Sequence, residues 1–241
     1  SGDGNFNGSA DGEPHTVNAA NTTTTITSNT PDPSLVSEPY TVSWSVAVNS
    51  PGVGTPTGTV TVNGGTGGGS CSAPVASGSC QLTPTTVGVK TVTATYSGDA
   101  NFNGSTSTPI THTVNISITG TVRNGVTMAP VSGVTISLLQ MPLGTVLGTA
   151  TTNSLGGYAF VGQFTGPVAV QPTTGPPPYF DVTTRFYTLA GTNIVGADFL
   201  AYSSLTDIPR TLRLVNQYVV PGATGSMPVI LNSQDNETFL S

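Results

Sequence analysis

Apolar and polar residues alternate with period two along most of this chain. This pattern is typical of strands that bury one face, whereas the spacing of three and four residues expected of an amphipathic helix is not sustained anywhere. Short alternating runs separated by Gly- and Pro-rich turns predict an all-β chain of antiparallel β-sandwiches. We expect Trp44, the only tryptophan, in a core. The runs that bear most on the domain organisation lie at 40–48, 58–62, 87–96, 107–114 and 116–122.

A sequence repeat indicates how the chain is divided into domains. Residues 2–9 recur with one substitution as residues 98–105, and a His-Thr-Val-Asn sequence follows each copy. The spacing of about 96 residues has the size of a domain and is too long for a solenoid unit. We therefore expect residues 1–18 to be the last strand of a preceding repeat, and residues 19–115 to form one complete sandwich.

Composition narrows the classes of function. Charged residues make up 7% of the chain, compared with about 25% in typical soluble proteins, and the net charge is −6. With only 5 Lys and Arg residues, the chain lacks the basic stripe that neutralises phosphates, which argues against nucleic-acid binding. No apolar run approaches the ~18 residues of a membrane span.

The two cysteines, Cys71 and Cys80, flank a turn signal at 76–78. Two thiolates without a nearby His or further Cys make a poor zinc site, and the spacing is not the C-x-x-C of a redox pair. We interpret them as a structural disulfide across a hairpin, with a metal pair and a redox pair as the alternatives. A disulfide indicates an oxidising, extracytoplasmic location, extracellular or at the cell surface.

Residues 19–115 carry a characteristic set of motifs. They are Gly-Thr-Val at 58–60, the cysteine pair with Leu-Thr at 82–83, the strand 88–96 and Gly-Asp-Ala-Asn-Phe at 98–102. In these motifs the region resembles the bacterial immunoglobulin-like repeats (group 3) found in tandem in large surface proteins, and residues 1–18 resemble a fragment of one. The resemblance implies an immunoglobulin-like sandwich, a fold that is not tied to one activity.

Residues 116–202 carry a second set of motifs. They are Gly-Thr-Val at 120–122, Pro-Val-Ser-Gly-Val at 130–134, Gly-Gly-Tyr-Ala-Phe at 156–160 and Ala-Asp-Phe at 197–199. In these motifs the region resembles the carboxypeptidase regulatory-like (transthyretin-like) domain, although Ser154 and Gly156 replace the Asp and Asn usual in that family. The resemblance implies a compact β-sandwich that serves as a stalk or spacer without catalysis.

Residues 203–241 are similar to the first two strands of cohesin-like domains, with alternation at 210–216 and a returning segment at 227–232. A two-stranded piece cannot bury a core alone. We therefore expect partial cohesin-like strands or an exchange segment there. The predicted architecture has an immunoglobulin-like and then a transthyretin-like sandwich, with orphan strands at both ends.

Two acidic turns match the first half of an EF-hand calcium loop. The second copy lacks a closing Glu, and neither copy has flanking helices. The immunoglobulin-like resemblance accounts for these residues as a turn before the last strand, and we favour that turn over calcium binding. The candidate residues are Asp3, Asn5, Asn7, Asp99, Asn101 and Asn103.

No group of residues has the pattern of a catalytic site. There is no Gly-x-Ser-x-Gly elbow, and the few carboxylates are scattered in turns. We interpret His15 and His112 as strand residues. Lys90 could form an intramolecular isopeptide bond with an Asn or Asp, but we expect it to be exposed to solvent. We expect neither enzymatic activity nor a cofactor.

The leading hypothesis is a structural segment of an extracellular bacterial stalk, fibre or adhesin. Orphan strands are templates for strand addition, so we expect self-association into a head-to-tail homopolymer through the terminal strands. The alternative is an accessory module that binds a polysaccharide or docks a surface protein in the manner of a cohesin. Its candidate ligand-binding aromatics are Tyr179, Phe180, Phe186 and Tyr187.

Overall fold

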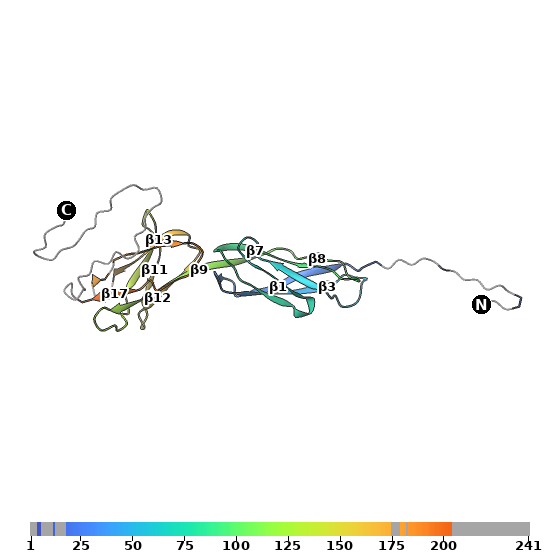
Figure 1. Cartoon of the computed structure of the whole chain (residues 1–241), viewed down its shortest axis with the longest axis horizontal. Helices are drawn as coiled ribbons and strands as arrows, with labels where there is room; N and C mark the ends of the chain where they lie inside the picture. Colours follow the sequence, from blue (N-terminus) through green and yellow to red (C-terminus); the bar gives the residue numbers. More distant parts are fainter. Residues whose placement is uncertain (1–3, 6–11, 13–17, 175–178, 182, 204–241) are drawn as a thin grey trace, which may run out of the picture.

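The computed structural model describes residues 4–5, 12, 18–174, 179–181 and 183–203. Within these residues, two β-sandwiches lie end to end and share one long strand, β9 (Ile110–Asn124) (Figure 1). The described residues contain no α-helix and one short 3-10 turn, Val75–Ser77. The predicted all-β fold of tandem sandwiches is therefore confirmed. The predicted orphan strands at 1–18 and 203–241 lie almost wholly outside the described residues.

The first sandwich has a sheet of order β1–β3–β6 and a sheet of order β9–β7–β4–β5. Alternation in β3 places Tyr40, Val42 and Trp44 in the core between the sheets, and Trp44 is 5% exposed, as expected. The strands are β1 (Thr22–Thr30), β3 (Tyr40–Val48), β6 (Ser79–Leu82), β7 (Gly88–Tyr96), β4 (Thr59–Asn63) and β5 (Ser70–Pro74). Two short strands, β2 (Ser34–Leu35) and β8 (Ser105–Thr106), pair with β9 and β7.

The second sandwich packs a sheet of order β11–β10–β13–β15 against the strands that pair with the second half of β9. Its core is filled by apolar residues from both sheets, among them Ile118, Leu138 and Phe199. The first sheet comprises β11 (Thr145–Thr151), β10 (Thr135–Gln140), β13 (Gly166–Thr174) and β15 (Arg185–Leu189). The second comprises β12 (Gly157–Gly162), β9, β16 (Ile194–Val195), β17 (Phe199–Tyr202) and β14 (Tyr179–Phe180).

The strand β9 differs from the sequence prediction, which placed two separate strands at 107–114 and 116–122. A single strand instead runs through both. Every even-numbered residue from His112 to Val122 is buried, so the period-two pattern passes from one core to the next without a break. The residue at position 115 is therefore part of a strand and not a linker.

Three of the motifs noted in residues 116–202 meet at one place in the second sandwich. The hydroxyl of Tyr158 donates a hydrogen bond to the carbonyl oxygen of Ala197. A Cβ at Gly120 would lie 2.3 Å from that carbonyl oxygen and 2.6 Å from the Tyr158 hydroxyl. Only glycine leaves room for this approach, which explains why a glycine precedes Thr121 in β9.

The disulfide predicted between Cys71 and Cys80 is confirmed. The two strands do not form a hairpin, however, because β5 pairs with β4 in one sheet and β6 pairs with β3 in the other. The bridge therefore fastens the two sheets of the first sandwich together at one side. With a sequence separation of 9, loop-closure entropy gives it a contribution of about 2–3 kcal/mol to stability.

Candidate functional site at the domain junction

The junction between the sandwiches is built around β9. In the first sandwich β9 pairs antiparallel with β7, and in the second it pairs antiparallel with β12. Along its other edge lie three short parallel strands, of which two flank the junction: β2 beside Val114 and Asn115, and β16 beside Ile118 and Thr119. Each sandwich thus adds a parallel strand on its own side of the junction, and residues 116–117 remain between them.

Asn193 bridges the gap between β2 and β16. Its Oδ1 accepts a hydrogen bond from the backbone N–H of Ser117 at 2.9 Å, and its Nδ2 donates to the carbonyl oxygen of Val36 at 3.0 Å. Val36 follows β2 in the first sandwich, whereas Asn193 precedes β16 in the second. One side-chain amide therefore satisfies backbone groups of both domains. Sequence reasoning missed this residue, because nothing in the sequence distinguishes Asn193 from an ordinary loop asparagine.

Close packing accompanies this polar bridge. Val87 of the first sandwich packs against the core of the second. Nearby, Gly191 has a φ of +84°, and a Cβ there would lie 3.3 Å from the carbonyl oxygen of Thr85. Glycine adopts this left-handed conformation without strain and leaves the two backbones in close approach. The domains therefore meet directly, without a spacer between them.

A buried polar cluster lies beside the junction, centred on His112 of β9. The imidazole is 0% exposed and stacks on the ring of Tyr40, with 3.7 Å between centroids. Its Nε2 lies 2.8 Å from the Ser34 hydroxyl, and its Nδ1 lies 3.3 Å from the Asn29 amide nitrogen and 3.6 Å from Asp32 Oδ1. The interpretation of His112 as a strand residue is confirmed, and its side chain ties β9 to the segment around β2.

Ser34, His112 and Asp32 stand in the order of a catalytic triad, but the hydroxyl is not accessible. Ser34 is 3% exposed, and its neighbour in the cluster, His112, is completely buried. A substrate carbonyl must reach the serine oxygen for acyl transfer, and no approach is open here. Ser34 also pairs with Val114 as part of β2. The geometry therefore supports a structural role, which is to hold β2 against β9.

The expectation that Lys90 is exposed to solvent is wrong. Lys90 is 7% exposed, because the alternation of β7 turns it to the core face, opposite His112 of β9. Its Nζ donates hydrogen bonds to the Thr86 hydroxyl at 2.6 Å and to the carbonyl oxygens of Thr66 and Val87 at 3.3 Å. These acceptors carry no charge, and burial lowers the pKa of Lys90. None of them is an Asn or Asp side chain, which an isopeptide bond requires.

The second candidate calcium loop forms a tight turn around Asp99. One carboxylate oxygen accepts hydrogen bonds from the hydroxyl and backbone N–H of Thr57 at 2.6 and 2.8 Å. The other accepts from the backbone N–H groups of Asn101 and Phe102 at 2.8 and 2.9 Å. These bonds, the Thr57 hydroxyl first among them, hold the pKa of Asp99 well below its usual value. Asn103 donates from its side-chain amide to the carbonyl oxygen of Ala19 at 3.1 Å.

The carboxylate of Asp99 and the side-chain amide of Asn103 therefore have partners within the protein, and Asn101 is held through its backbone. The calcium hypothesis stays a prediction. Among the described residues, no group of three or more His, Cys, Asp or Glu side chains could hold a metal ion. Of the first copy, Asp3, Asn5 and Asn7, only Asn5 lies within the described residues.

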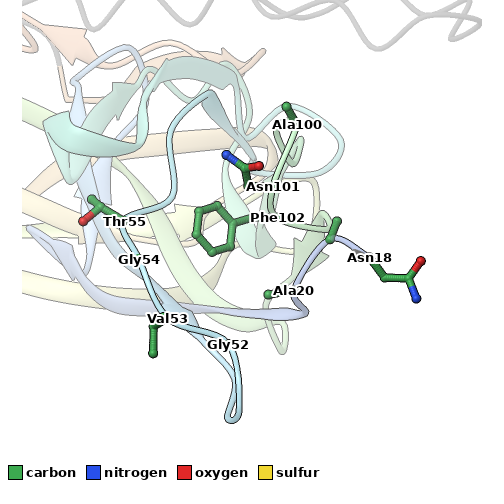
Figure 2. A pocket seen from close by; sticks show the side chains of 10 residues that line it. Asn18, Ala20, Gly52, Val53, Gly54, Thr55, Ala100, Asn101 and Phe102 are labelled. Atoms are coloured by element: carbon green, nitrogen blue, oxygen red, sulfur yellow. The ribbon is translucent and has the colours of Figure 1, made fainter. Parts of the chain in front are cut away.

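A cavity of about 470 Å³ opens beside this turn (Figure 2). It lies between the loop 52–55, the turn 100–102 and residues 18–20, which lead into the first sandwich. The ring of Phe102 points into the cavity. A Cβ at Gly54, where φ is +122°, would lie 3.0 Å from that ring. No charged side chain lines the cavity, so it offers no attraction to an ionic ligand.

The four candidate ligand-binding aromatics do not form an exposed platform. All four are half-buried. Phe180 and Tyr187 pack against the core of the second sandwich, where Phe180 meets the ring of Phe199 edge-on at 6.4 Å. Tyr179 and Phe186 lie in the paired strands β14 and β15. Burial raises the pKa of Tyr187, as expected for a side chain that completes a core. Their role in ligand binding stays a prediction.

Residues 24–115 match the family model of the bacterial Ig-like domain (group 3). The first sandwich is similar to this family over these residues, and we call it the Ig-like domain. The match confirms the immunoglobulin-like resemblance of residues 19–115, while the transthyretin-like and cohesin-like resemblances of the later residues stay predictions. No curated protein matches the chain.

Solved structures give only distant likenesses to the Ig-like domain and its neighbour. The T6 backbone pilin of Streptococcus pyogenes is 12% identical with a TM-score of 0.30, and covers 70% of this chain, which spans 51% of that pilin. The major pilin subunit BcpA of Bacillus cereus is 9% identical with a TM-score of 0.29, and the match covers 74% of this chain and 70% of BcpA. The fibronectin(III)-like modules of Clostridium thermocellum CbhA are 14% identical with a TM-score of 0.28, and the match covers 76% of this chain and 96% of those modules. Scores this low carry no conclusion about function.

Within the described residues, no helix has the length and apolar character needed to cross a bilayer.

Replacing Asn193 with alanine should loosen the junction at Ser117. The Ser117 N–H, in a residue 9% exposed, would lose its acceptor, at a cost of about 1–2 kcal/mol. Amide hydrogen exchange of Ser117 is expected to accelerate by roughly 5–30-fold. Thr192→Ala, at the exposed neighbouring position, is the control and should leave the rate unchanged. Equal exchange of Ser117 in both variants would contradict the bridging role of Asn193.

The stability of the Ig-like domain should fall on mild acidification because of His112. Burial lowers the pKa of His112, partly opposed by the Asp32 carboxylate. The folded state therefore binds the proton less readily than the unfolded chain, whose histidine has a pKa of about 6.5. The free energy of unfolding should be level above that value and decrease as the pH falls through it towards the folded pKa.

Urea unfolding between about pH 7.5 and about pH 5, followed by the fluorescence of Trp44, measures this dependence. His112→Gln should be less stable at the higher pH but lose less stability at the lower one. Parallel pH profiles of the two proteins would show that another group is responsible.

Proposed function

We propose that this chain is a structural segment of an extracellular bacterial surface protein, a stalk or fibre that spans distance from the cell. The observation that carries the proposal is β9, one strand that belongs to two sandwiches and is bridged by Asn193. Two further facts support a location outside the cytoplasm. The first sandwich is similar to the bacterial Ig-like domain family, and its Cys71–Cys80 disulfide is a bond that persists in oxidising compartments.

The shared strand makes the junction stiff. Domains joined by a linker usually move relative to one another. Here, a bend at residues 115–116 would disrupt the pairing of β9 with β2 or β16, together with the two hydrogen bonds of Asn193. A force that stretches the chain also acts parallel to β9. The hydrogen bonds of β9 to its antiparallel partners β7 and β12 would then be loaded in shear, and several would have to break at once.

In dilute solution, the two sandwiches of the full chain are expected to share one alignment tensor in NMR residual dipolar couplings, because β9 fixes their orientation. A Gly-Gly insertion between Asn115 and Ile116 should yield two tensors by interrupting β9, since glycine weakens strands. The same insertion between Leu143 and Gly144, in the exposed β10–β11 turn, is the control. Two tensors in the unmodified chain would overturn the stiff-stalk proposal.

We further propose that the chain ends mediate head-to-tail assembly, with residues 1–18 or 203–241 adding as strands to a neighbouring chain. The support is sequence evidence: residues 2–9 repeat the turn before the last strand of the Ig-like domain, and residues 210–216 alternate as strands do. Strand addition supplies main-chain hydrogen bonds, and a repeated heterologous contact gives an open filament.

Electron microscopy of the concentrated full chain should then reveal filaments one molecule wide. Val17→Pro should shorten or abolish them, because proline removes a donor and interrupts strand pairing. Asp11→Pro, placed in the preceding turn sequence, is the matched control and should leave filaments intact. A chain that stays monomeric at every concentration would contradict end-to-end assembly.

A further inference from the structure

The unpaired edges of a β-sheet accept strands from other molecules unless something prevents it. In the Ig-like domain, each outer strand has such a protection. β5 ends in Pro74 and is tied by the disulfide to β6, a strand of four residues. β1 is interrupted by a bulge between Ile26 and Ser28, and β2 has only two residues. Proline, bulges and short length all disfavour pairing with another chain.

Most outer strands of the second sandwich are protected as well. The pairing of β11 with β10 is broken by a bulge at Leu138 and Leu139. β15 begins with Arg185, whose guanidinium lies 3.5 Å from the carboxylate of Asp181, and β14 has only two residues. A charge at an edge opposes its burial against another strand.

β12 is the exception among the outer strands that the structure describes. It pairs with β9 in unbroken register from Gly157 to Gly162, without a bulge, a proline or a charge. Tyr158 and Phe160 are buried in the core, while Ala159 and Val161 lie on the outer face, with Val161 56% exposed. Tyr, Phe and Val favour extended backbone. The edge of β12 is therefore regular and ready to pair.

The charge distribution favours a second copy as the occupant. Between Arg123 and Asp181 the sequence contains no Asp, Glu, Lys, Arg or His. Neither β12 nor the segments that flank it in the sequence carry a charge, so a charged partner strand would find no complementary charge on them. Two copies of this chain, which repel each other elsewhere through a net charge of −6, can meet at this edge without like charges in opposition.

We propose that β12 pairs antiparallel with β12 of a second copy, joining the two sheets into one. Residues directly opposite in an antiparallel pair point to the same face. A two-fold axis through Ala159 places Ala159 opposite the partner's Ala159, and Tyr158 opposite the partner's Phe160. The buried residues then stay on one side of the joined sheet and the exposed ones on the other, so the edge is complementary to itself.

The contact is small. A strand of six residues is about 20 Å long, and its edge buries less than the roughly 800 Å² per partner of a standard interface. The pairing is therefore weak in solution. Copies anchored side by side would pair far more readily, because tethering raises their effective concentration. This lateral use rests on the proposed stalk function, whereas the pairing itself does not.

Sedimentation equilibrium of the full chain up to about 1 mM tests the pairing, together with amide exchange of β12 at low and high concentration. Self-association and concentration-dependent protection of Ala159 and its neighbours are expected. Ala159→Lys, at an exposed position, places a like charge directly opposite its counterpart and should weaken association by about tenfold or more. The control is Val89→Lys, at an exposed position (60%) on β7, a strand that lies inside its sheet between β9 and β4.

Three results would overturn the proposal: no self-association of the unmodified chain in this range, equal effects of the two lysine substitutions, or concentration-dependent protection confined to the chain ends. The last would assign the contact to the terminal segments. A failure of the stalk proposal is separate, because the alignment tensors are measured on the dilute monomer.

Discussion

One strand serving two hydrophobic cores is the constraint on which the rest of the structure depends. The buried residues of β9 alternate from His112 and Val114 in the Ig-like domain to Ile116 and Ile118 in the next sandwich. Residues 110–119 contain neither Gly nor Pro, so no position in this stretch favours a bend. Because a one-residue slip would turn every side chain to the wrong face in both domains, each core fixes the register of the other.

A polar side chain fixes the relative orientation of the two domains at this junction. Apolar contacts such as that of Val87 stabilise association but do not select one orientation. Asn193 is held by hydrogen bonds to Ser117 and Val36, one on each side of the junction. The hydrogen bonds of His112 and Lys90 lie within the Ig-like domain, where they fix the positions of β9 and β7. The polar cluster around His112 joins β9 to Asn29 of β1, to Asp32 and to Ser34 of β2. Because Val36 directly follows β2, this cluster also holds in place the acceptor to which Asn193 donates.

Local pattern was sufficient for much of this fold. Alternation predicted β3, β7 and the buried position of Trp44, and the cysteine spacing predicted the disulfide. The continuity of β9 was missed because motifs suggested a domain boundary where the alternation in fact continues. The burial of Lys90 followed from its own alternation, but the preference of lysine for solvent was given more weight. Asn193 could not be recognised, because its acceptor Val36 lies 157 residues away and is brought near only by packing.

The position of Lys90 has a consequence for resistance to proteolysis. Proteases of trypsin-like specificity cut after Lys or Arg, and they require a segment that can leave the fold and extend in their cleft. From residue 18 to residue 174 the only such residues are Lys90 and Arg123. Both stand within paired strands, and the lysine side chain is enclosed. A digestive enzyme of this class therefore meets no loop that it can cleave across the Ig-like domain and most of its neighbour.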